Sequence, residues 1–257
     1  MILDYVLCDP TGNITVLVLT PVPIDRQADI AARIMSPGGV PCEQVGYLTL
    51  PPAGPASLRM MGGEFCGNAT MSAASYIALT NGAKPGDSLT VPITVSGAQG
   101  VLDCAVTVND GYCTGSVSMP RVTGVTEKGG VTRVDMDGIT HFVIRSALPD
   151  DEAVSLLRRL SSSVATDAVG LLQWDGTFMK PLVYVRATDT RVWENGCGSG
   201  SACLGACLAY LEGVNERVTR VAQPGGVITV HTRAAEYGYQ TTITGNVKVG
   251  KVRQIKI

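Results

Sequence analysis

The sequence contains few aromatic residues and little charge. Aromatic residues account for 5% and charged residues for 16% of the 257 residues, whereas globular domains usually carry about 25% charged residues. Because 45% of the residues are hydrophobic, the interior must be packed mainly with aliphatic and small side chains. This composition excludes a disordered chain. At about 150 residues per domain, the length predicts one large domain or two small ones.

Positive charge is not in excess either. The 20 basic and 22 acidic residues give a net charge of −2, without a basic cluster. We therefore expect neither nucleic acid nor a membrane surface as a partner, and we favour a small molecule. No apolar run approaches the about 18 residues of a membrane span, and residues 1–5 contain no positively charged start followed by an apolar stretch. The expected location is the cytoplasm.

Cysteine, by contrast, is plentiful. Without a signal peptide, the eight cysteines are better interpreted as reduced thiols than as disulfides. Cys203 and Cys207 have a spacing that could suggest a metal site, but the two histidines, His141 and His231, are not near them in sequence. We therefore expect core packing there and no metal site. The same packing role is expected for Cys8, Cys42, Cys104 and Cys113.

Alternating apolar residues, many of them β-branched, predict that most of the chain forms strands. The expected strands cover residues 2–7, 14–19, 45–50, 89–95, 101–108, 112–119, 131–136, 139–144, 169–174, 182–185, 218–222, 227–231 and 239–243. Helices are expected at 25–35, from 66 to about 81, at 151–161 with Asp150 as the N-cap, and from 197 to about 212. Two of these helices begin at a cysteine.

The two helices that begin at a cysteine can be aligned without a gap. Residues 66–82 read CGNATMSAASYIALTNG, and residues 197–213 read CGSGSACLGACLAYLEG. Both are nearly free of charge, so each should be buried on almost all sides. We interpret the chain as a duplication with an α+β fold, in which two pseudo-symmetric halves each wrap a strand array around a central buried helix.

The duplication predicts where the halves divide. The first half is expected at residues 1–120, carries Cys66 and is completed by a strand at about 248–257. The second half is expected at residues 121–247 and carries Cys197. Residues 120–130 lack apolar periodicity and are expected to connect the halves.

The N-terminal ends of both helices are candidate catalytic sites. A buried helix start has unpaired backbone N–H groups and about half a positive charge, so it attracts a carboxylate. A cysteine at such a terminus can have its pKa lowered from about 8.5 to about 3.5–7.5, because the same donors favour the thiolate. Two matched thiols on opposite faces of one carbon would suit a racemase, in which one group removes the α-proton and the other delivers a proton. This scheme requires no cofactor.

At these residues the chain resembles the diaminopimelate epimerase superfamily of cofactor-independent racemases and epimerases. Residues 62–69, GGEFCGNA, resemble its first cysteine motif, and residues 197–200, CGSG, its second. Further matches lie at residues 11–13, 43–44, 141 and 191–194. The resemblance implies two catalytic thiols, Cys66 and Cys197. It also implies substrate-binding roles for Asn13, Gln44, Gly67, Asn68, His141, Glu194, Gly198 and Ser199. For His141 and Glu194 it further implies tuning of the thiol pKa values or binding of the α-ammonium group.

Three positions depart from the diaminopimelate epimerase pattern. Ile139, Ala168 and Asn195 replace residues that this family uses to hold the distal amino and carboxylate groups of its substrate. These changes argue against diaminopimelate, since a site lacking partners for polar groups discriminates strongly against them. The remaining motifs are closest to the branch that includes histidine racemases, which makes histidine the favoured substrate.

Alternatives remain at this stage. One is a diaminopimelate epimerase, and another is a proline or hydroxyproline racemase, although Asn68 replaces the histidine that follows Cys-Gly in proline racemases. Outside enzymes, the alternative is a non-catalytic amino-acid-binding protein. In every case the expected partner is a small amino acid, and a homodimer is the assembly to test.

Overall fold

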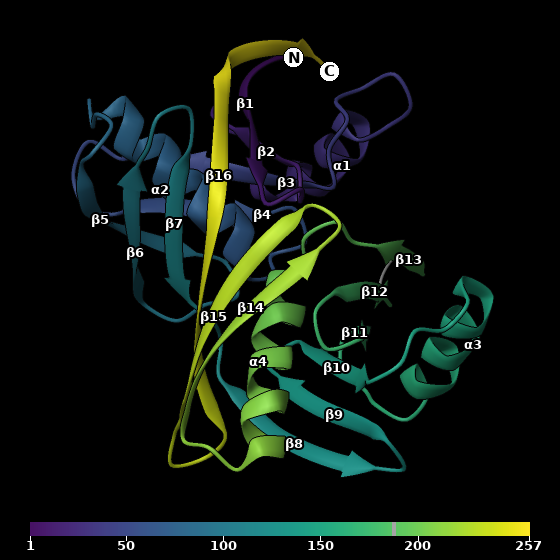
Figure 1. The fold of residues 1–257 in the computed structure, drawn as a ribbon. Helices are drawn as coiled ribbons and strands as arrows, with labels where there is room; N and C mark the ends of the chain where they lie inside the picture. Colours follow the sequence, from purple (N-terminus) through teal and green to yellow (C-terminus); the bar gives the residue numbers. More distant parts are fainter. Residues whose placement is uncertain (187–188) are drawn as a thin grey trace. The chain divides into compact units, whose positions relative to one another are not determined.

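A computed structural model describes residues 1–186 and 189–257 (Figure 1). The chain divides into two compact units. Unit 1 comprises Met1–Ser118 together with Thr244–Ile257, and unit 2 comprises Met119–Ile243. Each unit packs strands around a nearly apolar helix that begins after a cysteine, which confirms the predicted α+β class with two similar halves.

Unit 1 is a ring of strands around a helix. Its elements are β1 (Ile2–Pro10), β2 (Thr15–Val18), α1 (Ile24–Ile34), β3 (Gln44–Thr49), β4 (Ala56–Met60), α2 (Gly67–Thr80), β5 (Ser88–Val95), β6 (Val101–Val108), β7 (Cys113–Ser118) and the part of β16 (Tyr239–Lys256) that begins at Thr244. Neighbouring strands pair in the order β1 to β7, β7 then pairs with β16, and β16 pairs back with β1. Because α2 contacts β1, β2, β4, β5, β6 and β7, it lies inside this ring.

Unit 2 repeats the plan with a more open strand array. Its elements are β8 (Val122–Lys128), β9 (Val131–Met136), β10 (Ile139–Ile144), α3 (Asp150–Ser161), β11 (Ala168–Trp174), β12 (Met179–Val185), β13 (Thr190–Trp193), α4 (Gly198–Glu212), β14 (Glu216–Gln223) and β15 (Gly226–Ala234). Strands β8 to β13 pair in sequence, and β14 and β15 join them through the first residues of β16. Figure 1 shows α4 against β14 and β15, and α4 also contacts β8 to β11.

Small residues let the two central helices approach their strands closely. A Cβ built on Gly115 would come within 2.7 Å of the Met71 Cβ in α2, and a Cβ on Gly205 in α4 would come within 2.7 Å of the Thr232 Oγ1. Both helices are buried along nearly their whole length, as predicted. The outer helices α1 and α3 instead bury one apolar stripe each. In the described part of the chain, no helix has the length and apolarity to cross a membrane.

One parallel strand pair in each unit has an equivalent register. In unit 1, β2 pairs with β3, and Leu17 lies opposite Gly46. In unit 2, β10 pairs with β11, and His141 lies opposite Gly170. When the two glycines are aligned, the imidazole of His141 in unit 2 takes the register position of the Leu17 side chain in unit 1. Two residues earlier on each strand, the directly opposed pairs are Thr15 with Gln44 and Ile139 with Ala168.

Two local predictions are wrong. Residues 120–130, expected as an irregular connection, contain β8, which pairs with β9 along its length. Its sequence lacks alternation because only Val122 of this strand is buried. The predicted N-cap Asp150 lies inside the first turn of α3, and Pro149 occupies the N-cap without a side-chain hydrogen bond. The short strands β4 and β13 have no counterpart among the predicted strands.

Candidate active site

Cys66 and Cys197 are the N-cap residues of α2 and α4. The Sγ of Cys66 accepts a hydrogen bond from the backbone N–H of Ala69 at 3.4 Å. The Sγ of Cys197 accepts one from the N–H of Gly200 at 3.2 Å. Cysteine replaces the oxygen-bearing side chains that usually cap helices, so each sulfur lies where a helix start favours negative charge.

The backbone around the two cysteines is also held alike. The hydroxyl groups of Thr70 and Ser201, four residues after each cysteine, donate to the Cys66 and Cys197 carbonyl oxygens at 2.7 Å in both units. The N–H groups of the same two residues bond to these carbonyls at 3.0 Å. The likeness predicted between residues 66–82 and 197–213 therefore extends to individual hydrogen bonds.

In unit 1, the Cys66 thiol contacts a network of amides. It donates to the Oε1 of Gln44 at 3.2 Å. The Nε2 of Gln44 donates to the Oδ1 of Asn13 at 2.6 Å and to the Oγ1 of Thr15 at 2.8 Å. The Nδ2 of Asn13 donates to the Oε2 of Glu43 at 2.6 Å. Three turn and strand segments thus converge on one thiol.

Asn68 joins the same network from the first turn of α2. Its side chain is buried, and its Nδ2 donates to the Asn13 Oδ1 at 3.2 Å. Gly67, before it, is buried as well. The structure therefore places Asn13, Gln44, Gly67 and Asn68 around or next to Cys66. It adds Thr15 and Glu43, whose part in the network the sequence did not indicate.

In unit 2, the Cys197 thiol contacts a hydroxyl that is held by a histidine. The Sγ of Cys197 lies 3.6 Å from the Ser199 Oγ, which lies 3.0 Å from the Nε2 of His141. His141 has no exposed surface, and burial lowers its pKa to about 3, so the imidazole is neutral. Within the described residues, its Nδ1 has no hydrogen-bond partner. A buried unpaired acceptor is less costly than a buried unpaired N–H, so the proton lies on Nε2 and is donated to Ser199.

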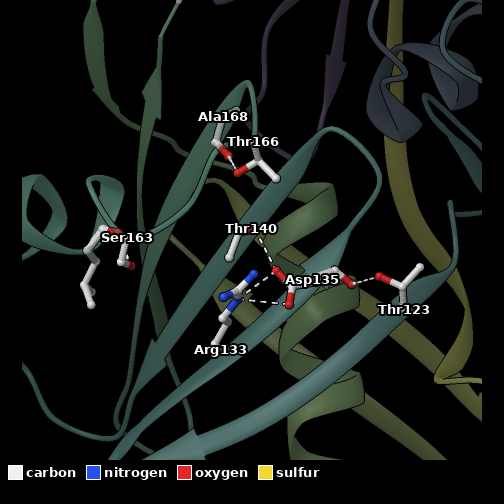
Figure 2. Close-up of polar contacts among 8 residues, drawn as sticks. Thr123, Arg133, Asp135, Thr140, Ser163, Thr166 and Ala168 are labelled. Carbon is white, nitrogen blue, oxygen red and sulfur yellow. Dashed lines mark hydrogen bonds and ion pairs between the residues drawn. The ribbon is translucent and has the colours of Figure 1, made fainter.

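Figure 2 shows the polar contacts of Thr140, the neighbour of His141 on β10. Thr140 donates to the Oδ1 of Asp135 on β9 at 2.8 Å. Adjacent strand residues point to opposite faces, so Thr140 fixes one face of β10 while His141 reaches Ser199 from the other. At the start of β11, the Oγ1 of Thr166 donates to the Ala168 carbonyl at 3.0 Å. The first contact joins β10 to β9, and the second orders the residues that lead into β11.

The pKa of the Cys197 thiol is shifted in the direction opposite to the prediction. The pKa of its thiol is raised well above the usual value, first by burial and then by the Glu194 carboxylate. Ser199 and the Gly200 N–H act in the opposite direction. The predicted lowering of the pKa by the helix start is therefore outweighed, because removing a charge from water and placing it near a carboxylate costs more than these donors return.

Gln223 is a residue of this site that sequence reasoning missed. This buried side chain on β14 accepts from the Cys197 N–H through Oε1 at 2.7 Å, and its Nε2 donates to the Ser201 Oγ at 2.9 Å. Gln223 thus accepts the hydrogen bond of the Cys197 N–H, which lies before α4, and it holds the N-cap of α4 against β14. No motif surrounds Gln223, so only the fold reveals its role.

The remaining cysteines form no second site. Five are fully buried and Cys42 is half-buried, and all eight cysteines are free thiols. Burial raises the pKa of Cys8 and Cys104 to about 12 and that of Cys42 and Cys207 to about 11. Among the described residues, no group of His, Cys, Asp and Glu side chains has the arrangement of a metal site. These thiols are inert packing residues at neutral pH.

The chain is similar in sequence to histidine racemases. The family model described as the histidine racemase CntK N-terminal domain matches residues 2–252. A histidine racemase of Staphylococcus aureus (strain Mu50 / ATCC 700699) is 31% identical over 264 residues, which covers 96% of this chain and 94% of the relative. A histidine racemase of Fusobacterium nucleatum is 30% identical, with 88% of both chains covered.

Solved structures share the fold at lower sequence identity. A Bacillus anthracis phenazine biosynthesis protein of the PhzF family has a TM-score of 0.73 at 14% identity and covers 100% of both chains. A hydroxyproline epimerase from Agrobacterium vitis, with bound trans-4-hydroxy-L-proline, has a TM-score of 0.69 at 12% identity and covers 99% of this chain and 91% of that one. These similarities show that the chain shares its overall fold with these proteins.

Proposed function

Because the chain belongs to the histidine racemase family, we propose that it interconverts L- and D-histidine, with Cys66 and Cys197 as the two proton-transfer residues. The observation that carries the assignment of residues is the matched geometry of the two thiols. Each caps a buried helix, and each sulfur accepts the N–H of the third residue that follows. Each thiol serves one face of the α-carbon. One removes the α-proton while the other delivers a proton, and the roles exchange in the reverse reaction.

The helix starts supply the stabilisation that this chemistry needs. Removing the α-proton moves negative charge onto the substrate carboxylate, and preorganised N–H donors stabilise that charge. We assign these donors to the first turns of α2 and α4, at Gly67, Asn68, Gly198 and Ser199. The first turn of each helix is largely buried, which strengthens such hydrogen bonds. The scheme uses no cofactor.

We assign the substrate's α-ammonium group to Glu194. A carboxylate is the natural partner of an ammonium group, and Glu194 is half-buried next to Cys197. An ammonium group bound there would cancel the negative charge that opposes a Cys197 thiolate. Binding of an amino acid would therefore prepare Cys197 to act as a base.

The substrate side chain is assigned to the region of Ile139 and Ala168. Both are half-buried, and in register they replace the polar Thr15 and Gln44 of unit 1. An apolar wall suits the flat face of an imidazole and offers no hydrogen-bond partner to a second zwitterionic group. This difference favours histidine over diaminopimelate.

Deuterium exchange tests the proposed function. L-histidine incubated with the protein in heavy water should become racemic and gain deuterium at Cα, as read by chiral chromatography and mass spectrometry. Cys66→Ala and Cys197→Ala should each abolish racemisation, while Cys104→Ala serves as the control at a buried cysteine outside the network. Binding without exchange would instead indicate an amino-acid-binding protein.

A substrate panel separates the remaining enzyme alternatives. Twenty L-amino acids, hydroxyproline and diaminopimelate should be assayed side by side, and turnover should be greatest with histidine. Faster turnover of proline or diaminopimelate would overturn the substrate assignment and leave the two-thiol chemistry intact. We also infer a cytoplasmic location from the free thiols, and a homodimer remains to be tested by light scattering.

A further inference from the structure

We propose that Gln44 is a positioning residue whose amide group is locked with its oxygen toward Cys66, so that Cys66 keeps its proton in the free enzyme. The inference rests on the proposed two-thiol function only for its catalytic consequence. It is carried by the directions of five hydrogen bonds around Gln44, in which every donor and acceptor can be assigned from chemistry.

The first lock begins at Glu43. An ionised carboxylate can only accept hydrogen bonds, so the Asn13 group that lies 2.6 Å from the Glu43 Oε2 must be the NH2. The Oδ1 of Asn13 then faces Gln44 and can only accept. The Gln44 group at 2.6 Å from that oxygen must therefore be its NH2.

The second lock is independent of Glu43. The Thr15 hydroxyl donates its single hydrogen to the backbone carbonyl of Asn13 at 3.0 Å. Its oxygen is then left to accept, and the Gln44 group 2.8 Å away must again be the NH2. Thr15 lies directly opposite Gln44 in the parallel pair of β2 and β3, so the strand register maintains this contact.

Both locks leave the Gln44 carbonyl facing the sulfur. An amide oxygen only accepts, so Cys66 must supply an S–H at 3.2 Å. The sulfur meanwhile accepts from the Ala69 N–H at 3.4 Å. A thiolate would bring its negative charge against the negative end of the Gln44 dipole. The amide cannot turn to relieve this without breaking its bonds to both Asn13 and Thr15.

Among the residues of unit 2 that the structure describes, the corresponding strand pair carries no such lock. Ala168 occupies the register position of Gln44, and Ile139 that of Thr15. Cys197 instead faces the hydroxyl of Ser199, which can donate to a thiolate. The two thiols are therefore unequal in the free protein. In the direction that starts from this state, Cys197 releases its proton to solvent when the amino acid binds, the resulting thiolate takes the α-proton, and Cys66 gives its proton to the opposite face. After that turnover Cys66 is the thiolate and Cys197 the thiol, and one proton must return to Cys66 from solvent.

The lock can be opened by changing both restraints. Glu43→Gln and Thr15→Val each remove one restraint, and the double variant removes both, so that the Gln44 NH2 can turn toward the sulfur. Peptide mass spectrometry measures the rate at which iodoacetamide alkylates Cys66 at neutral pH. This rate is divided by the rate at high pH, where every thiol is ionised. We expect the relative alkylation rate of Cys66 in each single variant to stay within about twofold of the wild-type rate. In the double variant this rate should rise about tenfold, because the Gln44 amide then donates a hydrogen bond to the sulfur in place of accepting one.

Controls separate the lock from loosened packing. Glu43→Gln with Thr15→Ser keeps the hydroxyl and should behave like wild type, and the buried Cys8 and Cys113 of the same unit should stay unmodified. A double variant that reacts at the wild-type rate would overturn the proposal. So would a single variant that already shows the full increase.

A measurement on the wild-type protein does not depend on any variant of the lock. The infrared S–H stretch of Cys66, isolated by difference from Cys66→Ser, should be present at neutral pH and shifted as for a hydrogen-bonded donor. Absence of this band would overturn the proposal. Neither measurement requires turnover, so a failure of the lock and a failure of the racemase assignment give different results.

Discussion

The imidazole of His141 fills the space that a side chain at Gly170 would occupy. A Cβ built on Gly170 would overlap the Nδ1 of His141, and the two residues lie opposite each other in the parallel pair of β10 and β11. The glycine therefore permits a buried imidazole to lie flat against β11 with Nε2 directed at Ser199.

Gly170→Ala should displace this imidazole. We expect a loss of about 1–3 kcal/mol in the free energy of unfolding, typical of overpacking, and a fall in kcat as His141 leaves Ser199. Urea unfolding and racemase assays measure the two effects. Gly124→Ala is the matched control, because its Cβ would meet only the Asp135 Oδ2 at 3.7 Å. Wild-type stability and activity in Gly170→Ala would show that the strands can move apart freely.

Stability should depend on His141 at acid pH. Its pKa in the folded protein is about 3 because of burial, and an unfolded histidine has a pKa of about 6.5. Between these values the unfolded chain binds more protons, so the contribution to stability is complete above about pH 6.5 and falls by up to about 1.4 kcal/mol per pH unit below it.

The matched variant for this effect is His141→Leu, which copies Leu17 of unit 1. The difference in unfolding free energy between wild type and variant should shift in favour of the variant as the pH falls from 6.5 to about 4.5. Urea titrations at several pH values measure it. A difference that does not change with pH would contradict a neutral buried imidazole.

Ser199→Ala should impair the Cys197 thiolate. Ser199 lowers the pKa of Cys197 against the larger raising effects of burial and Glu194, so its loss should raise the pKa further and reduce kcat/KM by about tenfold. L- and D-histidine have equal free energies, so kcat/KM must fall by the same factor in both directions. Ser199→Thr keeps the hydroxyl and should retain most activity. Equal losses in both variants would point to packing instead.

Glu194→Gln should separate the pKa of Cys197 from substrate binding. Burial remains the main cause of the raised pKa of Cys197, but the second cause, the carboxylate charge, is removed, so the pKa should fall and the pH dependence of kcat should move to lower pH. Loss of the ammonium partner should raise KM by about tenfold or more. Glu64→Gln, at an exposed position, is the control. An unchanged KM would remove Glu194 from the ammonium site.

Local sequence was sufficient for the two central helices and the cysteines at their starts. The apolar stretches after Cys66 and Cys197 contain no charge that could face water, so burial and the cysteine N-caps followed from composition and position. Local sequence could not predict the register of the strands, and it could not predict the strand β8. Its single buried residue, Val122, leaves no alternation to detect.

The networks around the thiols depend on contacts between distant segments. Glu43, Thr15 and Gln223 act through neighbours that lie up to 30 residues away along the chain, and polar residues in turns and strands give no sign of such partners. The direction of the Cys197 pKa shift also required the fold, because burial and the neighbouring carboxylate outweigh the helix start.

Strand β16 imposes an order on biosynthesis. Unit 2 is one continuous stretch, Met119–Ile243, whereas the ring of unit 1 closes only when Thr244–Ile257 pairs with β1 and β7. The half of the enzyme that leaves the ribosome first is therefore completed last. Until then β1 and β7 expose unpaired edges, which are sites of wrong association, so a translation pause just before Thr244–Ile257 is made should increase the need for chaperones more than a pause within unit 1.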